Sequence, residues 1–191
     1  MKLYVITPEE QIENEPFIIG CLLKAGVTRV HIRHPQLQSD STRRLLDSIS
    51  PEYLPQLSLH DCHELAQDYG TGIHLNSRHR YVPPEFSGVL SKSCHSISEE
   101  GCDRLDYYFL SPVFTSISKQ GYHPTLTHEV IREAFLSGML DERAVALGGV
   151  TPERMAALRD MGFSSAAMLG YIWEGTTEEI IRRITTLCSN L

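Results

Sequence analysis

The stretch from Ser111 to Lys119, SPVFTSISK, places hydroxyl side chains and one cation directly after an apolar run. Ordinary turns prefer glycine, asparagine and aspartate, because those residues adopt turn conformations easily. Here Thr115, Ser116 and Ser118 offer O–H donors instead, and Lys119 adds a positive charge. This set of donors predicts a surface that binds an anion.

Two glycine-bearing turns predict a second place for an anion. ALGGV contains Gly148 and Gly149 just before a helical pattern, and MLGYI contains Gly170 before the last helical pattern. Glycine lets the backbone approach a phosphate without an intervening Cβ atom. The N–H groups at the start of a helix then attract the negative charge. Either turn alone is an ordinary tight turn, but the two together predict phosphate binding.

Polar residues also recur where the other expected strands end. In chain order they are Thr7, His31 and Arg33, His60 and Asp61, His74 and Asn76, and Ser93 and His95. In a parallel barrel the carboxyl ends of all strands meet on one face, which is where the active site lies.

These residues follow short apolar runs rich in β-branched residues, which alternate with helical patterns and are expected to form strands. We expect strands at residues 3–6, 29–33, 57–60, 72–75, 89–93, 107–110, 144–147 and 166–169. Eight such units predict a compact (β/α)8 TIM barrel, formed as a single domain by residues 1–191. The chain is shorter than the ~250 residues typical of this fold. The segment between Leu75 and Val89 explains part of the difference, because it leaves no room for a helix.

The expected helices carry recognisable start and stop signals. They span residues 16–25, 42–49, 63–69, 127–137 and 151–161, and a last one follows Thr176. Thr151 is expected to cap its helix, with Pro152 at the first helical position. Thr176 and Glu179 have the spacing of a capping box.

Composition excludes several classes of function. The formal net charge is -7, so the overall field repels nucleic acid and anionic membranes. The five cysteines form no C-x-x-C pair, which indicates free thiols in a reducing compartment. The N-terminus has no apolar segment of the kind that directs export, and no run is long enough to span a membrane. We therefore expect a cytoplasmic protein that binds small molecules.

Four segments resemble the thiamine phosphate synthase and TenI family: DYYFLSPVFTSISK, KSCHS, ALGGV and SSAAMLGYI. The family pattern has Gly-Pro-x-Phe followed by Thr-x-Thr-Lys, a Ser-x-His-Ser stretch and a Gly-Gly-Ile turn. The similarity runs from LYVIT at the start to the last helix, and the SPVFTSISK loop is its most specific part. The resemblance implies an enzyme of thiamine biosynthesis. It would join hydroxymethylpyrimidine pyrophosphate to thiazole phosphate and release pyrophosphate.

The resemblance also implies roles for individual positions. Pyrophosphate would be contacted by Arg33, Ser93 and Lys119, and Mg²⁺ would be bound by Asp61. The thiazole substrate would contact Ser116 and Ser118, and its phosphate would lie against Gly149, Leu169 and Gly170. Homodimers are common in the family, although no apolar stripe in this chain requires one.

The chain departs from the synthase pattern on the pyrophosphate side. The pattern Gln-x-Arg-x-Lys becomes His31-Ile-Arg33-His-Pro35, so the lysine is lost, and Asn-Asp becomes His60-Asp61. We place His31 and His60 among the substrate-binding residues. His79 stands where the second Mg²⁺ carboxylate is expected, which weakens a Mg²⁺ site and favours Zn²⁺ or Mn²⁺. Nearby cations could replace the lost lysine, but we expect them to be solvated: Arg78, Arg80 and Lys92.

These departures leave other functions open. One is a TenI-like thiazole tautomerase, which needs a phosphate site and a histidine base but no metal. Its catalytic histidine falls at Pro112 here, so His31, His60 or His95 would have to act instead. The others are a non-catalytic binder of thiazole phosphate and, more remotely, an unrelated metal-dependent barrel hydrolase. The retained Arg33, Asp61 and Lys119 favour the synthase.

Overall fold

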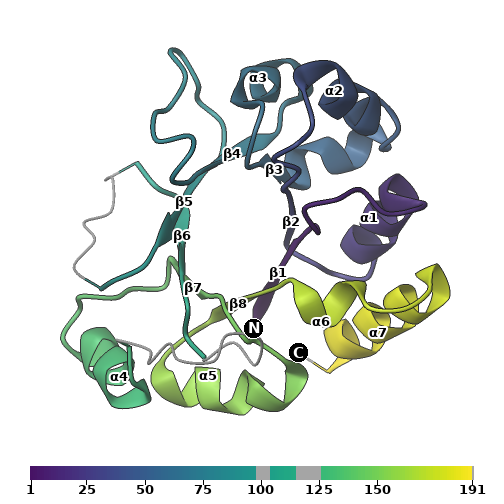
Figure 1. Ribbon diagram of the computed structural model, residues 1–191. Helices are drawn as coiled ribbons and strands as arrows, with labels where there is room; N and C mark the ends of the chain where they lie inside the picture. The colour runs from purple at the N-terminus through teal and green to yellow at the C-terminus, as the bar shows by residue number, and fades with distance from the viewer. Residues whose placement is uncertain (98–103, 115–125, 191) are drawn as a thin grey trace.

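A computed structural model describes residues 1–97, 104–114 and 126–190. Eight parallel strands each pair with the next, and β8 pairs with β1, so the sheet closes into a barrel (Figure 1). The strands are β1 (Lys2–Ile6), β2 (Arg29–Ile32), β3 (Leu57–Leu59), β4 (Gly72–Leu75), β5 (Leu90–Cys94), β6 (Tyr107–Leu110), β7 (Ala144–Ala146) and β8 (Ser165–Met168). The predicted (β/α)8 fold is confirmed, and every predicted strand bound lies within one residue of the observed one.

The helices lie outside the ring of strands (Figure 1). The α-helices are α1 (Glu15–Lys24), α2 (Ser39–Asp47), α3 (Ala66–Tyr69), α4 (His128–Leu136), α5 (Met155–Met161), α6 (Gly170–Trp173) and α7 (Thr177–Ser189). Three 3-10 turns accompany them: η1 (Pro51–Gln56), η2 (His63–Leu65) and η3 (Pro152–Arg154). The segment between β4 and β5 contains no helix, as its sequence predicts.

The predicted helix signals have mixed outcomes. Thr176 and Glu179 form the expected capping box at the start of α7. The predicted cap at Thr151 is wrong, because its side chain makes no capping hydrogen bond and the chain enters α5 through η3 instead. Neither η1 nor α6 was expected from the sequence pattern.

Alternation along the strands divides the core into two layers. Leu3, Val5 and Leu59 face outward and join the large cluster between strands and helices. Residues of opposite parity face the barrel interior, where the smaller cluster consists of Tyr4, Ile6, Tyr107, Phe109, Val145 and Ala167. These six residues come from β1, β6, β7 and β8, so that side of the interior is apolar.

The interior residues of β2 to β5 are mostly polar. His31, Ser58, His74 and Ser91 are fully buried there. Near the amino end, Arg29 Nη1 donates to Leu57 O at 2.6 Å. Gly72 makes this possible, since a Cβ atom at that position would lie 2.7 Å from Ser58 Oγ and 3.2 Å from Arg29 Nη1.

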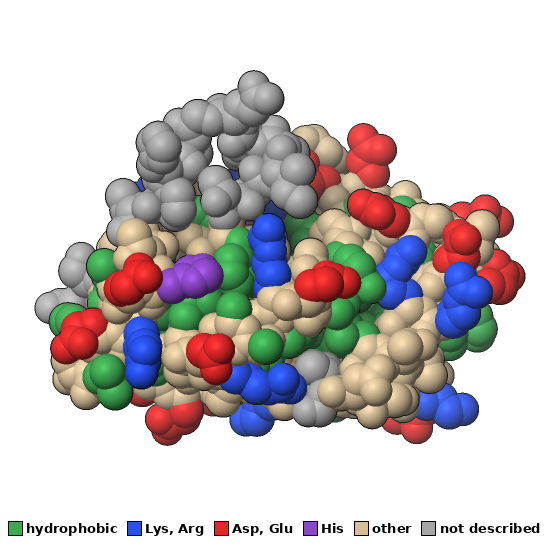
Figure 2. Space-filling view, turned by 90° about the horizontal axis from the view of Figure 1, so that it is seen from below, with side chains coloured by type: hydrophobic (Ala, Val, Ile, Leu, Met, Phe, Trp, Pro, Cys, Tyr) green, Lys and Arg blue, Asp and Glu red, His purple; other side chains and the backbone are tan. Residues whose placement is uncertain are grey.

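The outer surface carries charges of both signs. On the face drawn in Figure 2, acidic and basic side chains are interspersed with apolar ones, and neither sign forms a continuous patch. None of the helices in the described ranges is long and apolar enough to cross a membrane.

Phe109 joins the two halves of the interior, and its truncation should strongly destabilise the fold. Its ring is fully buried and lies 4.6 Å from the His31 ring and 4.8 Å from the His74 ring, centroid to centroid. We expect Phe109→Ala to lower the free energy of unfolding by about 3–5 kcal/mol. Denaturant unfolding at neutral pH measures this. The exposed Leu136 provides the control, and Leu136→Ala should change the value by less than about 0.5 kcal/mol. Equal effects of the two variants would contradict the central position of Phe109.

Candidate active site at the carboxyl ends of the strands

Most of the predicted site residues lie where the strands of the barrel end. Arg33, His60 and Asp61 follow β2 and β3, and Ser93 lies near the end of β5. On the opposite side, Gly149 follows β7 and Leu169 follows β8. Ser116, Ser118 and Lys119 lie outside the described residues, and their roles stay predictions.

His31 and His60 form a buried hydrogen-bonded pair inside the barrel. His31 Nδ1 lies 2.9 Å from His60 Nε2, and the other ring nitrogen of His31 lies 2.8 Å from the hydroxyl of Tyr107. Tyr107 belongs to β6, so this chain of contacts crosses the interior from one side of the barrel to the other. His31 is completely buried and His60 is 4% exposed. His60 is therefore the member nearer the barrel mouth, by which we mean the open end of the barrel at the carboxyl ends of the strands.

His74, on β4, holds neighbouring polar groups of the site in place. Its Nδ1 lies 2.8 Å from Ser91 Oγ, and its Nε2 lies 2.8 Å from Ser93 Oγ. The ring also stacks on His60, with 4.1 Å between centroids and 18° between planes. His74 therefore fixes the hydroxyl of Ser93, a predicted pyrophosphate contact. The shared parity of residues 91 and 93 on β5 was the sequence signal for this arrangement.

Burial keeps all three imidazoles uncharged. It lowers the pKa of His31 and of His60 well below the usual histidine range, and the neighbouring His74 adds to both shifts. Burial also lowers the pKa of His74 to about 3. The ionised form is disfavoured because the barrel interior solvates a charge poorly. At neutral pH the three side chains thus act as neutral donors and acceptors.

The three histidines do not share a metal ion in this arrangement. One nitrogen from each of His31, His60 and His74 can be chosen so that all lie within 4.8 Å of one another. However, a metal must lie close to the plane of every imidazole that binds it. The His60 and His74 rings are stacked and almost parallel, so their planes do not meet at a bonding distance. The cluster is a hydrogen-bond network.

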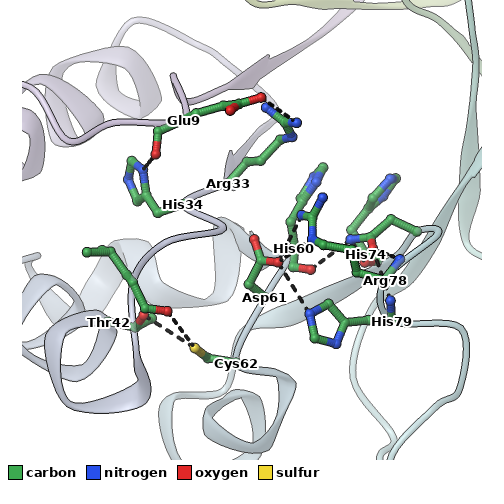
Figure 3. Close-up of polar contacts among 12 residues, drawn as sticks. Glu9, Arg33, His34, Thr42, His60, Asp61, Cys62, His74, Arg78 and His79 are labelled. Atoms are coloured by element: carbon green, nitrogen blue, oxygen red, sulfur yellow. Dashed lines mark hydrogen bonds and ion pairs between the residues drawn. The ribbon is translucent and has the colours of Figure 1, made fainter.

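Asp61 is bound by side chains of the loop after β4. Its Oδ1 accepts hydrogen bonds from Arg78 Nε at 3.1 Å and Arg78 Nη2 at 2.9 Å (Figure 3). His79 Nε2 lies 3.3 Å from the same oxygen. Arg78 is therefore an ion-pair partner of Asp61, which corrects our expectation of a solvated surface charge.

The described residues around Asp61 do not fit Mg²⁺. This ion requires a nearly octahedral set of oxygen ligands. Here one carboxylate oxygen is already bonded to Arg78, and the nearby His79 offers only nitrogen. Asp61 Oδ2 is buried with no hydrogen-bond partner in the described structure, but the adjacent guanidinium repels a second cation. Within the described ranges, no group of three His, Cys, Asp or Glu ligands includes Asp61 or His79.

Arg33 lies at the barrel mouth and forms an ion pair that an incoming anion could replace. Its Nη2 lies 2.8 Å from Glu9 Oε1, and 62% of the Glu9 side chain is exposed. Its backbone N–H donates to Thr7 Oγ1 at 2.8 Å. The next residue, His34, is buried and lies 2.9 Å from Glu15 Oε1, which anchors the chain beyond Arg33. An incoming anion would compete only with an exposed carboxylate for the Arg33 guanidinium.

The glycine turns form the other side of the mouth. Gly148 and Gly149 both have positive φ, at 96° and 61°, and a Cβ atom on Gly148 would lie 2.9 Å from Pro112 Cα. Arg154 Nη1 donates to Gly149 O at 2.6 Å and fixes the turn. Gly170 begins α6, and a Cβ atom there would meet no heavy atom of the described residues within 4 Å. On this side of the mouth, the described residues therefore leave room beside Gly170.

The closed barrel defines the chain as a TIM-barrel protein, with polar residues at the carboxyl ends of its strands, where active sites of this fold lie. Within this class, the chain belongs to the TMP-TENI family, described as thiamine monophosphate synthase, whose sequence profile matches residues 3–172.

Individual relatives agree with this assignment. The chain is 22% identical to a thiamine-phosphate synthase of Actinobacillus succinogenes, over 94% of this chain and 88% of the relative. It is 26% identical to the enzyme of the same name from Serratia proteamaculans, over 87% and 86%. A crystal structure of thiamine phosphate pyrophosphorylase from Bacteroides thetaiotaomicron is 30% identical, with a TM-score of 0.87 over 100% of this chain and 98% of that one. The pyrophosphorylase of Pyrococcus furiosus, 16% identical with a TM-score of 0.72 over 99% and 96%, shares the fold.

The neutral histidines predict that acid destabilises the protein. Their pKa values are lowered in the fold, whereas in the unfolded chain they bind protons below about pH 6.5. Stability should therefore be complete above pH 6.5 and fall as the pH is lowered toward 3, because the unfolded chain then binds more protons. Each histidine contributes up to about 1.4 kcal/mol per pH unit in that window.

Two variants test this origin of the pH dependence. His31→Gln/His60→Asn inserts the amides of the family pattern and should make unfolding free energy less dependent on pH between 4 and 6.5. The same measurement on His128→Gln, at an exposed position, should retain the wild-type dependence. An unchanged dependence in the double variant would contradict the assignment to the buried pair.

Proposed function

We propose that this chain is a thiamine-phosphate synthase, a transferase that joins hydroxymethylpyrimidine pyrophosphate to thiazole phosphate and releases pyrophosphate. Membership of the family and the names of the relatives support the activity. The observation that supports it most directly is the two-sided barrel mouth. Arginine side chains lie on the β2–β4 side and an open glycine turn lies on the β7–β8 side, as two differently bound anions require.

The reaction places different demands on the two sides. The bond between the pyrimidine methylene carbon and the pyrophosphate oxygen breaks, and its electron pair leaves with pyrophosphate. The thiazole nitrogen then donates its lone pair to the methylene carbon, and a C–N bond forms. The protein must stabilise the leaving negative charge and keep the methylene cation away from water.

We assign the pyrophosphate contacts to Arg33 and Ser93, with Lys119 as the third predicted contact. Arg33 can exchange its exposed partner Glu9 for a phosphate oxygen, and His74 holds the Ser93 hydroxyl in place. The pyrimidine ring would lie against His60, with His31 behind it. Because both imidazoles are neutral, they can form hydrogen bonds without placing a positive charge beside the methylene cation.

We assign the thiazole phosphate to the backbone of Gly149, Leu169 and Gly170, and the thiazole itself to Ser116 and Ser118. Four of the cysteines lie in the described ranges and are free thiols, which is consistent with a reducing cytoplasm as the site of action.

Coupling activity is the first test of this function. Purified protein should convert the two substrates to thiamine phosphate and pyrophosphate in equal amounts. The reaction is followed with and without Mg²⁺, and product under either condition supports the synthase. A protein that binds thiazole phosphate but forms no product in either buffer would be a binder or a tautomerase. Turnover of the thiazole carboxylate phosphate then separates those two.

The glycine turn after β8 provides a second test. Gly170→Asp places a carboxylate beside the proposed phosphate, and repulsion should raise the KM for thiazole phosphate by about 10-fold or more. Gly170→Ala is the matched control, because an added Cβ atom lies more than 4 Å from every heavy atom in the part of the chain that the structure describes. Steady-state kinetics are measured with each substrate varied in turn. Gly170→Ala should change the KM for thiazole phosphate only slightly. Neither variant should change the KM for the pyrimidine pyrophosphate. Equal loss for both substrates would contradict the proposed location.

A further inference from the structure

Asp61, the residue expected to bind a divalent cation, already binds a cation supplied by the chain. The guanidinium of Arg78 donates from both Nε and Nη2 to Asp61 Oδ1, at 3.1 and 2.9 Å (Figure 3). Only 12% of the Asp61 side chain is exposed, compared with 41% of Arg78. The pair thus has a sheltered carboxylate and a guanidinium that reaches the surface of the mouth.

The backbone before Arg78 is shaped to hold this pair. Asn76 Oδ1 accepts the N–H groups of Arg78 at 2.9 Å and His79 at 3.1 Å, so the loop turns directly after β4. The Asn76 amide also donates to His60 O at 2.8 Å, which ties the turn to the end of β3. The Asn76 side chain therefore fixes the turn that carries Arg78 and ties that turn to the end of β3.

Arg78 retains donors that can bind an anion. A guanidinium has five N–H groups, and the contacts with Asp61 use one from Nε and one from Nη2. Both hydrogens of Nη1 and one of Nη2 remain outside those contacts, which is the fork that binds phosphate oxygens in a bidentate manner. The position also suits a shared ligand. Ile32 pairs with Leu59, so Arg33 and Asp61 leave adjacent strand ends.

The charges at this position balance. In the pattern that the resemblance implies, one dication and two carboxylates sum to zero. Here one guanidinium and one carboxylate also sum to zero, because His79 stands in place of the second carboxylate. With His79 in place of a carboxylate, the position has one negative charge fewer. With Arg78 in place of a dication, it also has one positive charge fewer, so the net charge is the same.

We propose that Arg78 is the resident cation of the pyrophosphate site, positioned by Asp61 and Asn76, and that this protein binds pyrophosphate without a divalent metal. The proposal rests on the proposed function for the identity of the anion. Arg78 and Arg33 contact the pyrophosphate from two strand ends and stabilise its charge as it leaves. Asp61 is then a positioning residue for Arg78.

Binding of inorganic pyrophosphate tests this without requiring catalysis. Isothermal titration calorimetry is run on the full-length protein in a chelator and again with Mg²⁺. The wild-type protein should bind in the chelator. Arg78→Gln should bind about 10- to 100-fold more weakly, as expected for the loss of hydrogen bonds to a charged group. The neighbouring Arg80→Gln is the matched control and should bind within about twofold of wild type, since Arg80 donates to Ser77 O and has no contact with Asp61 among the described residues. Circular dichroism checks that each variant is folded.

A designed reversal gives a second readout. Arg78→Gln/His79→Asp removes the guanidinium and restores a second carboxylate, so its pyrophosphate binding should depend on added Mg²⁺. Wild-type binding that occurs only with Mg²⁺, or equal losses in Arg78→Gln and Arg80→Gln, would overturn the proposal. Metal-free binding by the double variant at wild-type strength would overturn it too. If coupling is absent but metal-free binding still depends on Arg78, the proposed function fails while this inference stands.

Discussion

Eight parallel strands that close on themselves turn every second side chain toward a space that excludes water. A polar group placed there must find a partner inside the barrel, because an unpaired buried donor or acceptor destabilises the fold. In this chain the polar groups come from β2 to β5, and the apolar groups of β1 and β6 to β8 fill the rest. The link between Tyr107 and His31 joins the two sides. Much of the site depends on this requirement, since Ser93 and His60 are held by the same network.

Burial keeps the imidazoles of His31 and His60 uncharged, and uncharged side chains suit the methylene cation proposed at the barrel mouth. Two amides in the family pattern are here two imidazoles, which are larger and can be protonated. Burial lowers the pKa values of His31 and His60 and keeps both side chains uncharged at neutral pH. In this state they resemble amides, as neutral donors and acceptors of hydrogen bonds.

The sequence predicted the barrel well because strand position depends on local pattern. His31 lies buried in β2, and Arg33 follows the end of that strand. Contacts that depend on side-chain orientation were not predictable in this way. Thr151 has the right residue type and neighbours for a cap, yet its side chain makes no capping bond. The ion pair between Arg78 and Asp61 could not be predicted from the sequence, because the position of Arg78 depends on a turn formed by the Asn76 side chain. The stacking of His60 on His74 likewise depends on rotamers that strand parity does not determine.

The two sides of the mouth differ in what a substitution can change. The β7–β8 side uses backbone, and backbone donors remain in place whatever the neighbouring residues are, provided that glycine is kept where φ is positive or space is required. The β2–β4 side uses side chains, so replacing one charge alters the charge balance for the others. Pro35 and His79 depart from the family pattern on that side, whereas Gly149 and Gly170 retain it on the other. In the proposed site, a change of the cation that would face the pyrophosphate therefore leaves in place the backbone groups that would bind the thiazole phosphate.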